Sequence, residues 1–181
     1  MKRIFLLVLV IVVFASCQDE QDPFEWNKDR IGMLTKDSKV YQLDSLFAND
    51  SIVTAPKSDE LMSTPDAIEI YEKGGKHLLT LSPYKADSTS VIENIRVRDE
   101  RYTTAKGINI NSDFKTINEA YKIGSIDNMI NSAVVWLNEE NFYFTIKKDV
   151  LPSAVKFDIA APIDKNMIPD SAQPEFVFIN W

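Results

Sequence analysis

Two segments of similar design restrict the folds that this chain can adopt. Residues 32–47 (GMLTKDSKVYQLDSLF) and 107–121 (GININSDFKTINEAY) each begin with glycine and pass through a short extended piece to a serine. Both then carry apolar residues at i, i+3, i+6 and i+7. That spacing places the apolar side chains on one face of a helix. The sequence therefore predicts two short amphipathic helices, with Ser38 and Ser112 as their N-caps.

Runs of residues that favour β-structure follow both predicted helices. In residues 67–81 (AIEIYEKGGKHLLTL), Gly74 and Gly75 separate two such runs. This is a strong hairpin signal, because both glycines can adopt a positive φ. Residues 132–146 (SAVVWLNEENFYFTI) predict a second hairpin, which turns at residues 138–141.

The repeated order of helix and hairpin predicts an internal duplication, with copies at residues 30–104 and 105–181. We therefore expect an α+β fold of two similar helix-plus-antiparallel-hairpin units packed as one compact domain. The alternative is that two unrelated stretches share a common pattern. The small α+β fold of β-lactamase-inhibitor-like and outer-membrane assembly lipoproteins also fits helix-then-hairpin repeats.

The strand patterns also predict which faces are covered. Residues 133–137 are apolar on both faces, which is typical of a strand with cover on both sides. Residues 155–160 (VKFDIA) and 176–181 (FVFINW) alternate more cleanly and predict half-exposed strands. The terminal Trp181 is expected to pack on the domain.

The N-terminus has the pattern of a signal peptide over residues 1–16. Lys2 and Arg3 precede an unbroken apolar run at 4–14, and small residues then lead into Cys17. The run is too short for a membrane helix, which needs about 20 apolar residues.

The tetrapeptide Phe14-Ala15-Ser16-Cys17 resembles the lipobox of bacterial lipoproteins, in which the cysteine is lipidated and becomes the mature N-terminus. Cys17 is the only cysteine, and lipidation would explain a lone thiol in an oxidising compartment. An ordinary secretory signal with an incidental cysteine is the alternative. We expect lipidation at Cys17 and an outer-membrane lipoprotein on the periplasmic face or the cell surface.

Residues 17–29 are polar, acidic and interrupted by Pro23, so they predict a tether. The acidic residues after Cys17 resemble the surface-export tract of Bacteroidota lipoproteins, although a solvated spacer would look the same. Phe24 and Trp26 are unusual in a linker and are expected to dock on the domain.

The charge balance narrows the class of partner. Twenty basic and 27 acidic residues give a net charge of −7, which argues against nucleic acid and against anionic headgroups. The expected partners are the membrane, through the lipid anchor, and an unknown envelope protein.

Few residues suggest chemistry. His77 is the only histidine. It would have to serve any Ser-His-Asp triad, but beside a turn it is more simply a rim residue. One histidine and a lipidated cysteine exclude a four-ligand zinc site. The carboxylates show no pairing pattern, and the S-x-x-K string at Ser112 is better explained by a helix cap. We expect no catalytic, cofactor-binding or metal-binding residues.

One set of aromatic residues could line a ligand groove, but at strand and helix spacing it more simply forms core. It comprises Tyr71, Phe114, Tyr121, Trp136, Phe142, Tyr143 and Phe144.

From about Ile31 to Trp181 the chain resembles the RpoE-regulated lipoprotein family of Gram-negative bacteria, a domain family of unknown function. The resemblance rests on AIEIYEKGGKHLLTL, on IENIRVRDE running into GININSDFKTINEAY, and on the aromatic C-terminus. It implies an envelope location and no reaction. We therefore expect a non-enzymatic envelope lipoprotein that binds an envelope partner or wall component. A small-ligand or lipid carrier with a groove between the two units is the alternative, and a hydrolase the third hypothesis.

Overall fold

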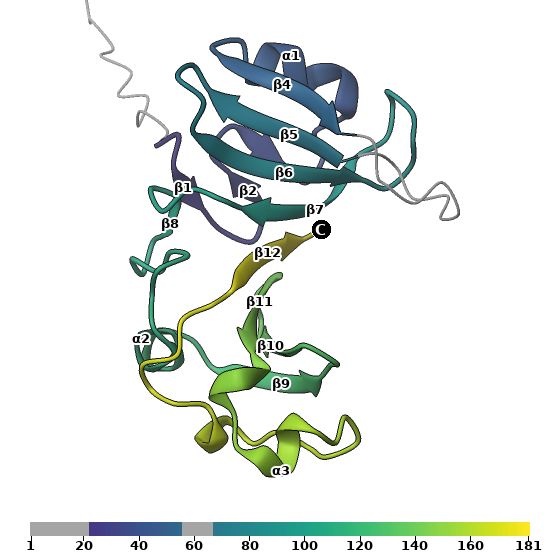
Figure 1. Cartoon of the computed structure of the whole chain (residues 1–181). Coiled ribbons are helices and arrows are strands. Elements are labelled where there is room, and N and C mark those ends of the chain that lie inside the picture. Colours follow the sequence, from purple (N-terminus) through teal and green to yellow (C-terminus); the bar gives the residue numbers. More distant parts are fainter. Residues whose placement is uncertain (1–21, 56–66) are drawn as a thin grey trace, which may run out of the picture.

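The computed structural model describes residues 22–55 and 67–181 (Figure 1). The predicted signal peptide (1–16) and lipidation site (Cys17) lie outside these residues. The fold is mostly β, with one sheet of eight strands, one of four, and a few short helices. The predicted α+β class is therefore wrong.

The large sheet is antiparallel and has the order β4-β5-β6-β7-β12-β11-β10-β9. Its strands are β4 (Asp50–Ala55), β5 (Ala67–Glu72), β6 (His77–Pro83), β7 (Ile92–Val97), β9 (Ile123–Asn128), β10 (Ser132–Leu137), β11 (Phe142–Lys147) and β12 (Phe176–Asn180).

The small sheet has the order β3-β2-β1-β8, and β1 runs parallel to β8. Its strands are β1 (Glu25–Trp26), β2 (Arg30–Ile31), β3 (Leu34–Thr35) and β8 (Thr103–Thr104). The helices are η1 (Val40–Gln42), α1 (Leu43–Leu46), α2 (Phe114–Ala120), η2 (Lys148–Val150), α3 (Ser153–Lys156) and η3 (Lys165–Met167).

Both predicted hairpins exist, as β5–β6 and β10–β11, and Gly74 and Gly75 have the expected positive φ. Each hairpin, however, belongs to a run of four antiparallel strands, which replaces the predicted helix-plus-hairpin unit. The extra strands β4 and β9 form the two edges of the sheet, and the two runs meet at β7–β12. The duplication at 30–104 and 105–181 stays a prediction.

The two serines of the repeated segments are not N-caps. Ser38 Oγ accepts a hydrogen bond from the backbone N–H of Thr35 at 2.9 Å, and Ser112 Oγ accepts one from that of Asn109 at 3.0 Å. Both serines therefore close the turn before the helix. The N-cap of α2 is Asp113, whose carboxylate accepts from the N–H of Thr116 at 2.8 Å.

The small sheet packs on the same core as the inner face of the large sheet. Trp26 of β1 is fully buried, and its ring centroid lies 4.6 Å from that of Phe142. Phe24 also packs against this core, so the expected docking of both aromatic residues is confirmed. The packed part of the chain therefore begins within the range 17–29 predicted as a tether.

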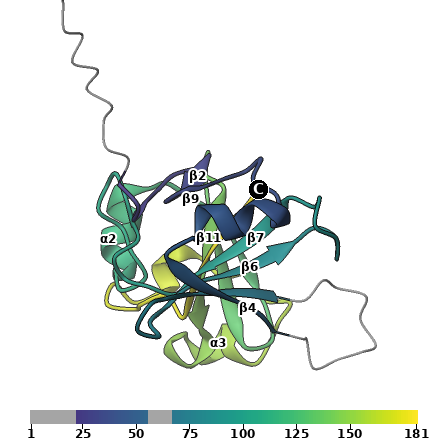
Figure 2. The same cartoon turned by 90° about the horizontal axis from the view of Figure 1, so that it is seen from above.

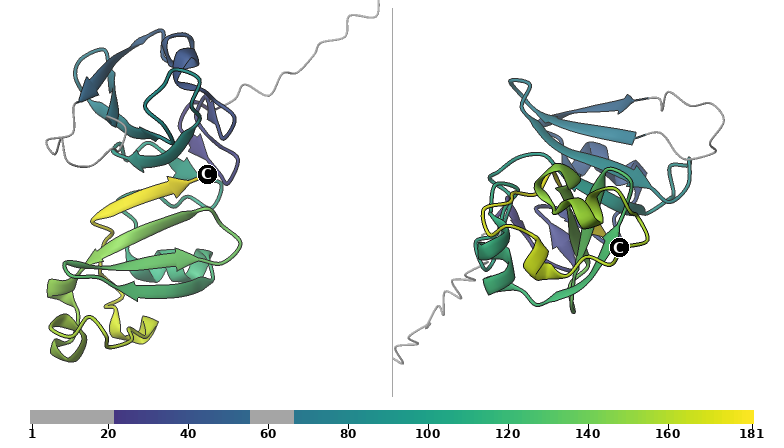
Figure 3. Two further views of the ribbon diagram at one scale, coloured as in Figure 1. Left: turned by 90° about the vertical axis from the view of Figure 1, so that its right-hand side faces the viewer. Right: turned by 60° about the horizontal axis from the view of Figure 1, so that its bottom comes forward.

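Short helices complete the core. In Figures 1 and 2, α1 and α2 lie apart, each beside its own half of the large sheet. The left panel of Figure 3 shows β12 to β9 side by side with α2 next to them. The ring centroid of Phe114, on α2, lies 6.4 Å from that of Phe144, on β11. None of the helices in the described ranges is long and apolar enough to cross a membrane.

The C-terminal predictions had mixed outcomes. FVFINW forms β12, and Trp181 packs against the core as expected. VKFDIA is not a strand, because α3 ends at Lys156 and a turn follows. Its alternating pattern instead leaves Phe157 and Ile159 exposed at 83% and 61%.

Candidate functional site

The outward face of the large sheet, opposite the core, carries a row of side chains that crosses seven strands. Register pairs join each member of this row to the next. From β4 to β10 the members are Val53, Glu69, Thr80, Arg96, Phe178, Tyr143 and Trp136. We call this side of the sheet the outward face.

Three aromatic rings stack along the row on β10, β11 and β12. The centroid of Trp136 lies 4.3 Å from that of Tyr143, which lies 5.1 Å from that of Phe178. The indole Nε1 of Trp136 donates to Asp127 Oδ2 at 2.7 Å, and the side chain remains 37% exposed. The prediction that residues 133–137 are covered on both faces is therefore wrong, because the outward rings shield one another instead.

Arg96 of β7 continues the row beside these rings. Its guanidinium carbon lies 3.4 Å from the ring centroid of Phe176 and 6.0 Å from that of Phe178. Burial, together with the nearby charge of Arg98, lowers the pKa of Arg96 to about 10. Within the described residues no carboxylate forms an ion pair with Arg96.

Arg98 follows two residues later on the same face. Its Nε donates to Thr80 Oγ1 at 2.9 Å, and that hydroxyl donates to Glu69 Oε2 at 2.7 Å. Arg96 and Arg98 both line a cavity of about 220 Å³ between β7, β12 and the segment before α2. Its other lining residues are Val97, Ile110, Asn111, Pro174, Glu175, Phe176 and Val177.

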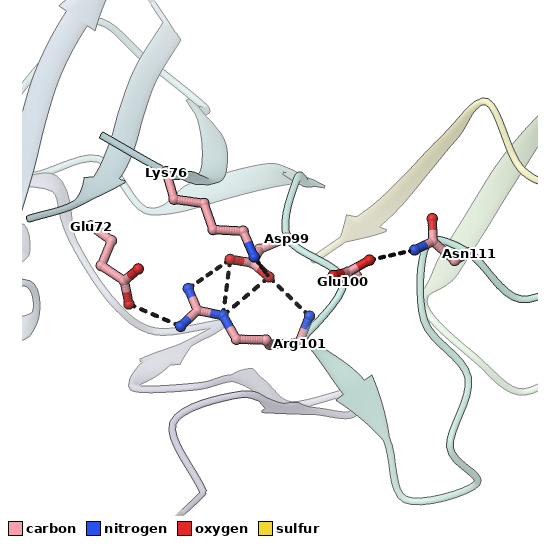
Figure 4. A network of polar contacts seen from close by, with 6 residues as sticks. All are labelled: Glu72, Lys76, Asp99, Glu100, Arg101 and Asn111. Carbon is pink, nitrogen blue, oxygen red and sulfur yellow. Dashed lines mark hydrogen bonds and ion pairs between the residues drawn. The ribbon is translucent and has the colours of Figure 1, made fainter. Parts of the chain in front are cut away.

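A buried carboxylate, Asp99, lies directly after Arg98 in the chain, just beyond the end of β7 (Figure 4). Asp99, with a fully buried side chain, lies between Lys76 Nζ at 3.1 Å and Arg101 Nη2 at 2.7 Å. Arg101 Nη1 reaches Glu72 at 2.9 Å, and its guanidinium carbon lies 4.3 Å from the ring centroid of Phe24. The network therefore joins β5, β7 and the N-terminal segment.

The same turn is tied to the cavity wall. Glu100 accepts a hydrogen bond from Asn111 Nδ2 at 2.6 Å (Figure 4). Asn111 lines the cavity beside Arg96 and Arg98. The turn after β7 thus holds both sides of the cavity in place.

Electrostatics explain why Asp99 stays ionised. Burial by itself would raise the pKa of its carboxyl, but hydrogen bonds from Arg101 and Lys76 bring that pKa below its ordinary value. In return, Asp99 and Glu72 raise the pKa of Arg101. The group acts as a structural clamp in its ionised form.

His77 lies on the outward face, at the start of β6. Its Nε2 is 2.5 Å from Glu69 Oε2 and 3.4 Å from Thr80 Oγ1, and its ring stacks on Tyr71 at 4.5 Å. A triad needs the acid on one ring nitrogen and the nucleophile on the other. Here a single nitrogen faces both groups, so this arrangement lacks triad geometry.

The remaining polar candidates do not converge. In residues 22–55 and 67–181, no group of three or more His, Cys, Asp or Glu side chains could hold a metal ion. Ser112 Oγ contacts Asn109, and Lys115 lies 4.0 Å from Glu119, so the S-x-x-K string forms no site.

The predicted aromatic set divides between two environments. Phe114, Tyr121, Phe142 and Phe144 are buried in the core, whereas Tyr71, Trp136 and Tyr143 lie on the outward face.

A second cavity, of about 420 Å³, lies between the small sheet, the end of α2 and the β10–β11 turn. Trp26, Tyr121 and Phe142 form its aromatic side, and Glu139 and Glu140 lie at the turn. Trp26 Nε1 is buried without a hydrogen-bond partner in the described residues. The sequence predicted the core contribution of these rings but not the cavity.

The arginine pair was also missed by the sequence reasoning, although a signal for it exists. In Ile95-Arg96-Val97-Arg98 the apolar and basic residues alternate. In a strand this pattern puts both arginines on one face and both apolar residues on the other.

Comparisons with known proteins give a fold and no activity. No family model matches the chain, and no curated protein matches it. A similar solved structure is that of the uncharacterized protein YfeY from Escherichia coli, with a TM-score of 0.56 and 10% sequence identity. The match covers 85% of this chain and 97% of that one. The chain therefore shares its overall fold with an uncharacterised bacterial protein.

Proposed function

We propose that this protein is a lipid-anchored, non-enzymatic cell-envelope protein that binds an envelope partner or wall component through its outward face. We also propose that it belongs to the RpoE-regulated lipoprotein family. Family membership is supported by the sequence resemblance and by the fold shared with a protein of a Gram-negative bacterium.

One observation carries the proposed binding role. The outward face presents Trp136, Tyr143 and Arg96, the residue types that dominate binding energy at interfaces, within four consecutive strands of the large sheet. These side chains are only partly shielded, and part of that shielding comes from contacts with one another. A sheet face with no partner usually carries short polar residues instead.

The test is site-specific crosslinking in intact cells. A photoreactive amino acid in place of Val134, on the outward face beside Trp136, should give an adduct with a partner. Adding Trp136→Ala should reduce that adduct about tenfold or more, because truncating a hot-spot aromatic residue typically costs at least 2 kcal/mol of binding energy. Mass spectrometry of the adduct would identify the partner.

A matched control uses another exposed apolar region of the chain. The same photoreactive residue in place of Ile159, which is 61% exposed beyond α3, should give no specific adduct. An adduct from position 159 that survives Trp136→Ala, with none from position 134, would place the binding surface elsewhere.

The location depends on one residue outside the described ranges. Replacing Cys17 by alanine should move the protein from the membrane fraction to the soluble fraction, because acylation is the proposed anchor and each buried CH₂ contributes about 0.8 kcal/mol. Fractionation with immunoblotting measures the change. Retention of Cys17→Ala in the membrane would contradict the lipoprotein assignment.

A small-ligand carrier is the second candidate function, and the cavity beside Trp26 favours it. Its volume of about 420 Å³ lies within the 300–1,000 Å³ typical of ligand pockets, and the indole of Trp26 forms part of its wall. Native mass spectrometry of the protein from its own cells should then detect a bound compound that Trp26→Phe releases. A wild-type mass without any adduct would reject this candidate.

A further inference from the structure

Arg96 and Arg98 stand out because neither forms an ion pair with a carboxylate in the described residues. The protein has 27 acidic residues against 20 basic ones, so carboxylates are in surplus. The nearby acids are nevertheless occupied. Glu69 meets His77 and Thr80, and Glu175 lies 3.8 Å from Lys147.

Leaving these two cations together is unfavourable for the free protein. Both side chains are half-buried, and for Arg96 burial and the like charge of Arg98 disfavour the charged form. Hydrophobic or oppositely charged residues would satisfy the same strand positions better. Such local conflicts in an otherwise consistent sequence are typical of functional positions.

The geometry leaves their donors available. The guanidinium carbon of Arg96 lies 3.4 Å from the ring centroid of Phe176, and none of its N–H groups has a hydrogen-bond partner in the described residues. Arg98 uses only Nε, toward Thr80, so its two Nη groups have no hydrogen-bond partner among those residues. Two planar forks that share one cavity match the oxygens of a phosphate or carboxylate.

The surroundings also suit an anion attached to a larger partner. The cavity of about 220 Å³ is mainly polar, and Ile110, Pro174 and Phe176 add apolar contact beside the two arginines. Glu175 also lines it and opposes an anion, but Lys147 partly offsets that charge. The aromatic row begins next to Arg96, at Phe178.

We infer that Arg96 and Arg98 form an oxyanion site that takes a phosphate or carboxylate group of the partner. This inference rests on the proposed function, because it supplies a charged contact in the middle of the outward face, next to the aromatic rings. The two arginines would fix the orientation of the partner, and the aromatic row would provide apolar contact.

The test uses the full lipidated protein in a non-ionic detergent and records the arginine Nε–H resonances during titration. Inorganic phosphate and succinate are the two probes, with chloride at equal ionic strength as the reference. At least one oxyanion should shift the Arg96 and Arg98 resonances in a saturable way. The probe that binds more tightly shows whether the site prefers a phosphate or a carboxylate group.

Three variants locate the effect. Arg96→Gln and Arg98→Gln should each weaken binding about tenfold or more, because a charge-assisted hydrogen bond contributes about 1.5–3 kcal/mol. Lys85→Gln removes the same charge at an exposed position beyond β6 and should leave the affinity unchanged. Arg98→Gln keeps the test valid if Arg96→Gln unfolds, since Arg98 does not pack on Phe176.

The outcomes separate this inference from the binding role. If neither oxyanion binds, or if Lys85→Gln weakens binding as much as the arginine variants, the oxyanion site is wrong. The Val134 crosslink and its loss in Trp136→Ala would stand in that case. Saturable oxyanion binding without any Val134 adduct would instead support the site and contradict the proposed outward-face partner.

Discussion

Replacing Trp26 by alanine is expected to lower the free energy of unfolding by about 3–5 kcal/mol, the usual cost of removing a buried indole. Trp26 is fully buried and packs against Phe142 at 4.6 Å. Its strand also joins the small sheet, pairing with Ile31 and with Thr104. Urea unfolding followed by circular dichroism would measure the change.

Trp26→Phe is the matched control. It keeps a ring against Phe142 and loses part of the indole volume, together with an Nε1 that has no hydrogen-bond partner in the described chain. We therefore expect a clearly smaller loss than for alanine. An equal loss of unfolding free energy in both variants would contradict the assignment of Trp26 to the core. A loss below about 1 kcal/mol in Trp26→Ala would also contradict it.

Asp99→Asn is expected to lower the free energy of unfolding by about 3 kcal/mol at neutral pH. This value is near the lower end of the range for breaking a buried ion pair. The lower end applies because Lys76 and Arg101 are 49% and 36% exposed and can be solvated after the change. Asp87→Asn is the control. Asp87 is an exposed carboxylate on the β6–β7 loop, and the urea midpoint of the Asp87→Asn variant should not change measurably.

The cost of Asp99→Asn should also depend on pH. The pKa of Asp99 is lower in the folded protein than its ordinary value of 3.8. The stabilisation that the Asp99 carboxylate gives to the folded protein is therefore complete above that value and is lost as the pH falls through the folded pKa. The difference between wild type and Asp99→Asn should narrow below about pH 4. A constant difference from pH 7 to pH 2 would show that Asp99 does not act through its charge.

The hairpins could be predicted because local signals determine them. Gly74 and Gly75 supply the positive φ values of a tight turn, and the alternating apolar residues on either side specify the strands. The edge strands β4 and β9 were missed because three of the six residues in each are polar, which leaves no clear apolar alternation. Two-residue strands such as β1 and β8 leave no periodic pattern at all.

The predicted α+β fold class was wrong for a related reason. A predicted helix contributes little to a fold when it spans only four residues, as α1 does. The candidate site posed a different difficulty, because alternation shows which residues share a face but not which face is covered. Trp136 and Tyr143 were assigned to core on their apolar character, whereas their partners across the strands place them on the outward face.

The position of β12 has a consequence for biosynthesis. This strand comes last in the chain, yet it lies in the middle of the large sheet, between β7 and β11. A nascent chain that has not yet released Phe176 and the residues after it therefore exposes two unpaired strand edges at once. Such edges pair readily with other chains. Aggregation is a hazard until residues 176–180 have left the ribosome, and loss of this strand would make that hazard permanent.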